Sequence, residues 1–109
     1  MKRILLFGAS GMLGRYVNRY LSDSGHYVVP AYRSNFNICN VGLLDVKNFI
    51  YTLHPDVVIN CAGIIKSRVG SASTIETVQV NSMFPLLLLQ ARKGLILMLQ
   101  QMGLHRTKQ

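Results

Sequence analysis

Three glycines directly behind a short apolar run constrain the fold of this chain more than any other feature. Residues 4–7 are continuously apolar, which is typical of a strand buried on both faces of a parallel sheet. Gly8, Gly11 and Gly14 follow, and from Gly11 onward the apolar residues recur with helical periodicity. A strand, a glycine turn and a helix in this order predict a turn that binds phosphate groups.

Each glycine of this turn has a distinct expected role. Gly8 allows a sharp exit from the strand, Gly11 lets a pyrophosphate approach the backbone, and Gly14 lets the helix pack closely. The spacing is GxxGxxG and differs from the standard GxGxxG fingerprint, so a purely structural turn remains the alternative. The residues that we expect around the phosphates are Gly8, Ser10, Gly11, Met12, Leu13 and Gly14.

Strand and helix patterns alternate along the rest of the chain. Residues 27–32 and 56–61 have strand patterns, whereas residues 43–53 and 75–90 have helical ones, the second broken or kinked at Pro85. Alternation of this kind predicts right-handed crossovers between parallel strands. We therefore expect an α/β fold with a Rossmann-type, doubly wound parallel sheet that is truncated.

The end of the second predicted strand bears on which dinucleotide would bind. An acidic residue at this position would hold the ribose 2′-hydroxyl of NAD, but Tyr32, Arg33 and Ser34 stand there instead. Arg33 and Ser34 could hold a 2′-phosphate, which favours NADP(H), with NAD(H) as the alternative. The competing interpretation of Arg33 is a solvated surface arginine.

Composition and charge exclude several other classes of protein. Half of the residues are hydrophobic, which indicates a globular chain, and half of the net charge of +8 lies in residues 91–109. Basic runs are short and do not alternate with aromatic residues, so we expect no nucleic-acid partner. Charged residues interrupt each long apolar stretch, and Cys39 and Cys61 form no metal or disulfide pattern. We expect a cytoplasmic protein with no membrane partner and no metal site.

Several segments together resemble an extended short-chain dehydrogenase/reductase. Within that superfamily, the likeness is strongest to dTDP-4-dehydrorhamnose reductases and related nucleotide-sugar reductases and epimerases, over about residues 3–90. The resemblance implies an incomplete NAD(P)-binding Rossmann domain over residues 1–90, with a nucleotide-sugar substrate in the intact family. The segments that carry it are the glycine turn, Asn37-Ile38, residues 54–63, and Val80-Asn81 with Pro85.

The resemblance also implies contacts with the rest of the cofactor. Asn37 and Ile38 would lie against the adenine, where the family usually has Asp at the position of Asn37. The side-chain carbonyl of Asn can also accept a hydrogen bond from the adenine amino group. The residues after the third strand that would line the cofactor are Cys61, Ala62 and Gly63.

The catalytic motif of this superfamily is missing from the chain. Its hydride-transfer enzymes use a Tyr with a Lys four residues later, and no tyrosine here has a Lys at that spacing. We therefore predict no catalytic residue and an NADP(H)-binding portion of a 4-keto-6-deoxyhexose reductase of the dTDP-rhamnose type, inactive alone. The alternatives are a non-catalytic NADP-binding sensor or interaction module, and a basic nucleic-acid binder.

Residues 91–109 do not carry the resemblance. The codons of residues 99–104 can encode Ser-Thr-Asp-Gly-Val in another reading frame, which is similar to a motif that the family has at its next strand. A frameshifted tail is therefore our hypothesis. Residues 95–104 would then be either an amphipathic helix or a chance apolar segment packed where a strand belongs, with an exposed sheet edge that favours a homo-oligomer.

Overall fold

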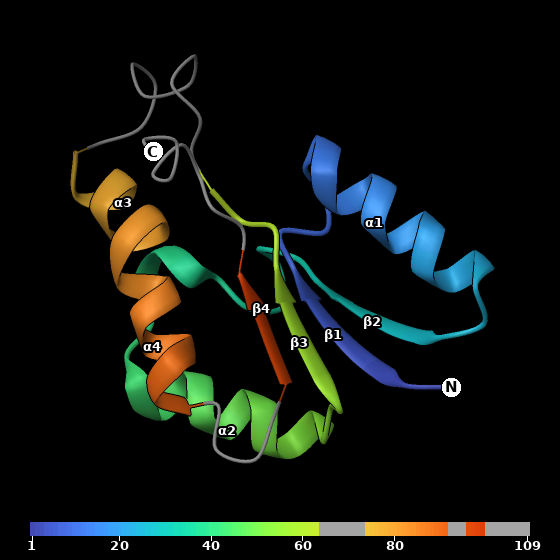
Figure 1. The fold of residues 1–109 in the computed structure, drawn as a ribbon. Coiled ribbons are helices and arrows are strands. Elements are labelled where there is room, and N and C mark those ends of the chain that lie inside the picture. The colour runs from blue at the N-terminus through green and yellow to red at the C-terminus, as the bar shows by residue number, and fades with distance from the viewer. Residues whose placement is uncertain (64–73, 92–95, 100–109) are drawn as a thin grey trace, which may run out of the picture.

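A parallel sheet forms the centre of the structure (Figure 1). The computed structural model describes residues 1–63 and 74–91 and the backbone of residues 96–99. Within this part, the sheet has the order β2-β1-β3-β4, which confirms the predicted Rossmann-type α/β fold. The strands are β1 (Arg3–Phe7), β2 (Tyr27–Ala31), β3 (Val57–Asn60) and β4 (Ile96–Leu99).

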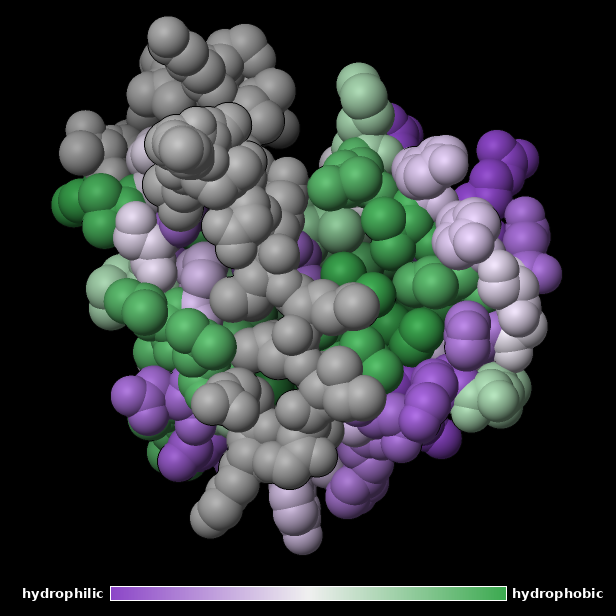
Figure 2. Space-filling view, in the orientation of Figure 1, coloured by the Kyte–Doolittle hydropathy of each residue, from purple (hydrophilic) through white to green (hydrophobic). Residues whose placement is uncertain are grey.

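Helices lie on both faces of the sheet, as a doubly wound fold requires (Figure 1). Helix α1 (Met12–Asp23) connects β1 to β2 on one face, and α2 (Leu43–Leu53) lies on the other. Because successive side chains of a strand point to opposite faces, Leu5 and Phe7 of β1 face α2 and belong to the main core. Apolar residues also gather at the centre of the face that carries α1 (Figure 2).

An aromatic cluster fastens the segment after β2 to the sheet. The rings of Phe7 and Phe84 meet edge to face at 4.9 Å between centroids, and those of Phe36 and Phe49 stack at 4.2 Å. Such ring pairs add about 0.5–1.5 kcal/mol each beyond the area that they bury. Since Phe36 comes directly before Asn37, the cluster fixes this segment next to the carboxyl ends of the strands.

The helix predicted over residues 75–90 is present but irregular. It begins as α3 (Thr74–Val78), changes to a π-helical turn, η3 (Gln79–Met83), and continues as α4 (Phe84–Ala91). Pro85 has no N–H to donate, and a π-helical turn before it adjusts the hydrogen-bond register. The expected kink at Pro85 is therefore a π-helical turn beside that residue and not a break.

Residues 96–99 form strand β4, parallel to β3, with Val57 paired to Ile96 and Asn60 paired to Leu99. The helical alternative for residues 95–104 is therefore wrong over these four residues, which lie at the sheet position where a strand was expected. An open strand edge explains the outcome, because the backbone groups of β3 need hydrogen-bond partners that only another strand supplies in series. Residues 95 and 100–104 lie outside the described residues.

Candidate functional site

A cavity of about 300 Å³ lies at the carboxyl ends of β1, β2 and β3. This is the point where the strand order reverses, which is the usual ligand site of open α/β sheets. Its walls come from the glycine turn, the segment after β2, the exit of β3 and the helix α3–η3. The predicted site residues that line it are Gly8, Ser10, Gly11, Tyr32, Arg33, Asn37, Ile38, Cys61, Ala62 and Gly63.

Four predicted residues do not line this cavity: Met12, Leu13, Gly14 and Ser34. Met12 is 86% exposed and Leu13 is 44% exposed, so both are largely open to solvent. Gly14 is buried beneath the turn, and Ser34 is exposed beyond the cavity. Their contact with a ligand stays a prediction.

Other lining residues are absent from the sequence-based prediction. Phe7, Ala31, Phe36 and Val80 have the pattern of core residues, which conceals that each also borders the cavity. No sequence pattern marked Cys39 or Glu76 as a site residue. Glu76 borders the cavity only because the fold brings α3, which is distant in sequence, to the site. Proximity to Asn37 is the one clue that could have identified Cys39.

The glycine turn shows which of its glycines the fold itself requires. Gly8 has a φ of +73°, and a Cβ on it would lie 2.4 Å from the backbone nitrogen of Ala62. A Cβ on Gly14 would lie 1.9 Å from the carbonyl oxygen of Gly8. By contrast, Gly11 has a φ of −74°, and its nearest neighbour would be 3.7 Å away. The fold therefore demands Gly8 and Gly14, whereas Gly11 leaves open space toward the cavity.

Helix α1 presents its N-terminus to this space. Gly11 is the N-cap residue, no side chain caps the helix, and its first turn contains no acidic residue. The helical hydrogen-bond ladder starts with the N–H of Arg15, which donates to the carbonyl of Gly11 at 2.9 Å. The N–H groups of Met12 and Leu13 precede that ladder, so they remain directed at the end of the helix, where anions bind.

The exit of β3 forms another wall, next to the glycine turn. The side chain of Asn60 is only 1% exposed, and its Oδ1 accepts a hydrogen bond from the N–H of Ala62 at 3.0 Å. The N–H of Cys61 donates to the carbonyl of Phe7 at 2.9 Å. Burial raises the pKa of the Cys61 thiol, so it is neutral at physiological pH. This turn holds the backbone of residues 61–63 close to Gly8.

The segment after β2 is fixed by two side-chain amides. Asn37 caps the short helix η1 (Ile38–Asn40), and its Oδ1 accepts a hydrogen bond from the N–H of Cys39 at 3.0 Å. The side-chain amide of Gln79 donates to the carbonyl of Ile38 at 3.1 Å. An amide oxygen has two lone pairs, so Asn37 keeps one for a ligand while it caps η1.

The guanidinium of Arg33 is directed at Glu76. Its Nη2 lies 3.6 Å from the Oε2 of Glu76 and donates to the Sγ of Cys39 at 3.8 Å. The two charged side chains are 70% and 41% exposed, so the pair contributes about 0.2–1 kcal/mol at most to stability. Its main effect is on charge, since the carboxylate of Glu76 offsets the positive charge of Arg33.

The described residues contain no group of three or more His, Cys, Asp or Glu side chains that could hold a metal ion. No helix in that part of the chain is long and apolar enough to span a membrane. The cavity offers backbone N–H groups on one side and the apolar surfaces of Phe36 and Ile38 on another. Such a site suits a ligand that is anionic at one end and flat and apolar at the other.

The comparison with family models agrees with this geometry. A model described as the NAD dependent epimerase/dehydratase family matches residues 4–100. The match continues past residue 90 and includes β4, so the likeness is longer than the sequence motifs indicated. Among curated proteins, none matches the chain significantly.

Solved dTDP-4-dehydrorhamnose reductases are similar to the chain. The Clostridium acetobutylicum structure is 28% identical with a TM-score of 0.72, and the alignment covers 87% of this chain and 34% of that one. The Yersinia enterocolitica enzyme is 25% identical with a TM-score of 0.73, covering 89% and 34%. The Bacillus anthracis enzyme in complex with NADP is 20% identical with a TM-score of 0.73, covering 88% and 34%. The chain spans about a third of the length of these structures.

Proposed function

The chain belongs to the NAD dependent epimerase/dehydratase family, and from this premise we propose that it binds NADP(H), in preference to NAD(H), along the glycine turn. The observation that carries the proposal concerns Gly11. The fold has room for a side chain at this position, yet the residue is a glycine, and it borders the cavity. The pyrophosphate would lie against the N–H groups at the start of α1. The adenine would lie against Ile38, and the nicotinamide end would extend toward residues 61–63.

The size of the cavity supports this arrangement. Its volume of about 300 Å³ is at the lower end of the range for small-molecule sites. A cavity of this size suits the adenosine and phosphate portion of a dinucleotide better than the entire molecule. The described residues would accordingly hold the adenosine half firmly and border the nicotinamide half.

We propose further that the chain is the cofactor-binding portion of a nucleotide-sugar reductase or epimerase. The support is its similarity to dTDP-4-dehydrorhamnose reductases, which points to a 4-keto-6-deoxyhexose carried on a nucleotide. A bound nicotinamide would supply hydride transfer to the keto carbon of such a sugar. Because no tyrosine of this chain has a Lys four residues later, we expect binding without measurable turnover by this chain alone.

Titration of the full chain with NADPH and NADH by calorimetry tests the proposed cofactor. We expect saturable binding of both, with NADPH bound at least about tenfold more tightly, since each charge-assisted hydrogen bond to the added phosphate accounts for a difference of about that size. A nucleotide-linked keto sugar added to the NADPH complex is expected to cause no oxidation of the cofactor. Absence of saturable binding, or tighter binding of NADH, would contradict the proposal.

A further inference from the structure

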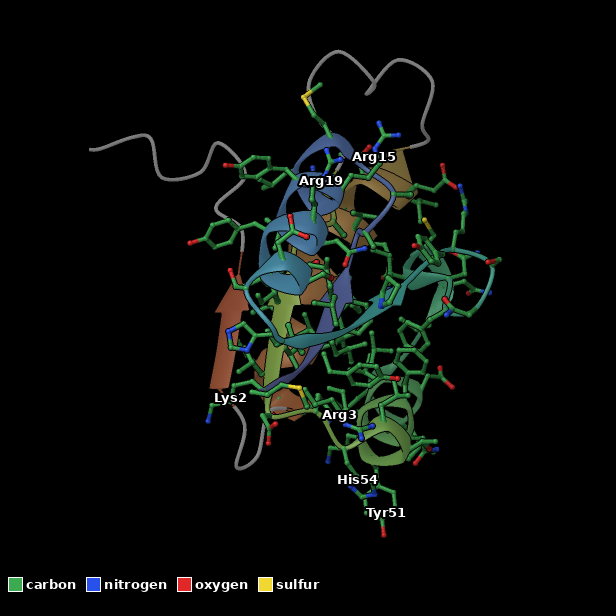
Figure 3. All side chains as sticks on the ribbon, turned by 90° about the vertical axis from the view of Figure 1, so that its right-hand side faces the viewer. Lys2, Arg3, Arg15, Arg19, Tyr51 and His54 are labelled. Atoms are coloured by element: carbon green, nitrogen blue, oxygen red, sulfur yellow. The ribbon has the colours of Figure 1, made fainter. Side chains whose placement is uncertain are left out.

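A second, shallower cavity lies on the outer side of the glycine turn. It has a volume of about 370 Å³ and extends along α1 from Arg15 to Ser22, and from there to the glycine turn and the segment after β2. Ser10 and Tyr32 line both this cavity and the first, so the two adjoin at these residues. Arg15 and Arg19 supply the charge of the second cavity, and Figure 3 shows both on α1.

The charge of this cavity is uncompensated among the described residues that line it. Arg15 and Arg19 are four residues apart, which places them on the same face of α1, and both are exposed. The other described lining residues include serine, asparagine and tyrosine but no Asp or Glu. Arg33 differs, because its guanidinium is paired with Glu76 on the side of the first cavity.

The position of the second cavity matches one part of a dinucleotide. In Rossmann folds, the residue at the end of the second strand contacts the ribose 2′-oxygen, and an Arg close to it accommodates a 2′-phosphate. In this chain, Tyr32 directly follows β2, and Ser10 faces the same place from the glycine turn. A phosphate on the 2′-oxygen would therefore enter the second cavity while the pyrophosphate occupies the first.

We propose that Arg15 and Arg19, with the hydroxyl of Ser10, hold the 2′-phosphate of NADP(H), and that Arg33 does not. The proposal rests on the proposed function, because it assigns one phosphate of the cofactor bound there. Arg33 and Glu76 instead border the adenosine, and a phosphate placed at Arg33 would meet the carboxylate of Glu76. This proposal is an alternative to the sequence-based assignment of the 2′-phosphate to Arg33 and Ser34, which stays a prediction.

Calorimetric titration of the full chain with 2′,5′-ADP and with 5′-ADP separates the 2′-phosphate from the rest of the ligand. In the double variant Arg15→Gln/Arg19→Gln, we expect the affinity for 2′,5′-ADP to fall about 30-fold, because two charge-assisted contacts are lost. The affinity for 5′-ADP is expected to change by less than about threefold, the range of screened surface charges. Arg33→Gln is expected to leave the preference for 2′,5′-ADP unchanged.

Lys2→Gln is the matched control for net charge. Lys2 lies at the opposite end of the molecule from Arg15 and Arg19 (Figure 3), so its removal should affect neither ligand. Equal losses for both ligands in the double variant would overturn the proposal, as would a loss of preference in Arg33→Gln alone. Those results would leave the proposed function standing, whereas failure of the unmodified chain to bind either nucleotide would contradict both. Circular dichroism of each variant verifies that its helices are intact.

Discussion

Gly11→Asp is expected to abolish NADPH binding and to leave the fold intact. Gly11 is the N-cap of α1, its φ is −74°, and a Cβ there would meet nothing closer than 3.7 Å. Asp is among the best N-cap residues and differs from Gly there by only a few tenths of a kcal/mol. The same carboxylate would stand where the pyrophosphate must lie, and like charges at that distance repel strongly. Calorimetry and thermal unfolding measure the two effects separately.

Gly11→Asn is the matched control for the charge of that carboxylate. Asn has nearly the same shape and caps helices equally well, but it is neutral. We expect Gly11→Asn to weaken binding through its bulk, and Gly11→Asp to weaken it by at least a further tenfold, about 1.4 kcal/mol. Unaltered NADPH binding by Gly11→Asp would show that the phosphates do not approach this turn.

Gly14→Ala is expected to act differently from Gly11→Asp: its main effect is a loss of folding stability. The added methyl carbon would lie 1.9 Å from the carbonyl oxygen of Gly8 and 2.8 Å from the Cα of Ala9. Both neighbours are backbone atoms, so α1 or β1 must shift to accept it. Overpacking of a buried site typically costs about 1–3 kcal/mol, and a clash with backbone is at the upper end of that range or beyond. The free energy of unfolding in urea measures this loss.

Gly42→Ala provides the comparison for that experiment. Gly42 is the N-cap of α2, with a φ of −110°, and a Cβ on it would lie 3.9 Å from the carboxylate of Asp45. This variant should lower the free energy of unfolding by about 1 kcal/mol or less, because Ala is a poorer cap than Gly. Similar losses for Gly14→Ala and Gly42→Ala would mean that Gly14 is not required for close packing.

Most of the described fold could be predicted from local patterns in the sequence. The apolar run that became β1, the glycine turn and the apolar stripe of α1 are each encoded by residues close together in the sequence. Pro85 likewise indicated an irregular helix, although not that the irregularity is a π-helical turn. Strand β4 was ambiguous because a short apolar run suits a helix or a strand equally well. Only its neighbour β3, whose edge needs partners, decides between them.

The candidate site, like the fold, could be predicted only where local sequence patterns mark its residues. The glycine turn and the exit of β3 are each formed by consecutive residues, so each was visible in the sequence. The structure brings the two segments to one cavity. Glu76 comes from a distant helix, so its pairing with Arg33 could not be inferred from spacing. Arg15 and Arg19 have the pattern of ordinary solvated helix residues, and only the second cavity gives them a role.

Backbone amide NMR during a titration with NADPH shows most directly whether the dinucleotide binds along the glycine turn. We expect saturable shift changes at residues 8–14, 32–38 and 61–63, which surround the first cavity and its border with the second. The amides near Lys2 and His54, at the opposite end of the molecule (Figure 3), should not move. Saturable changes confined to that opposite end, or no saturable change at all, would contradict a cofactor site at the glycine turn.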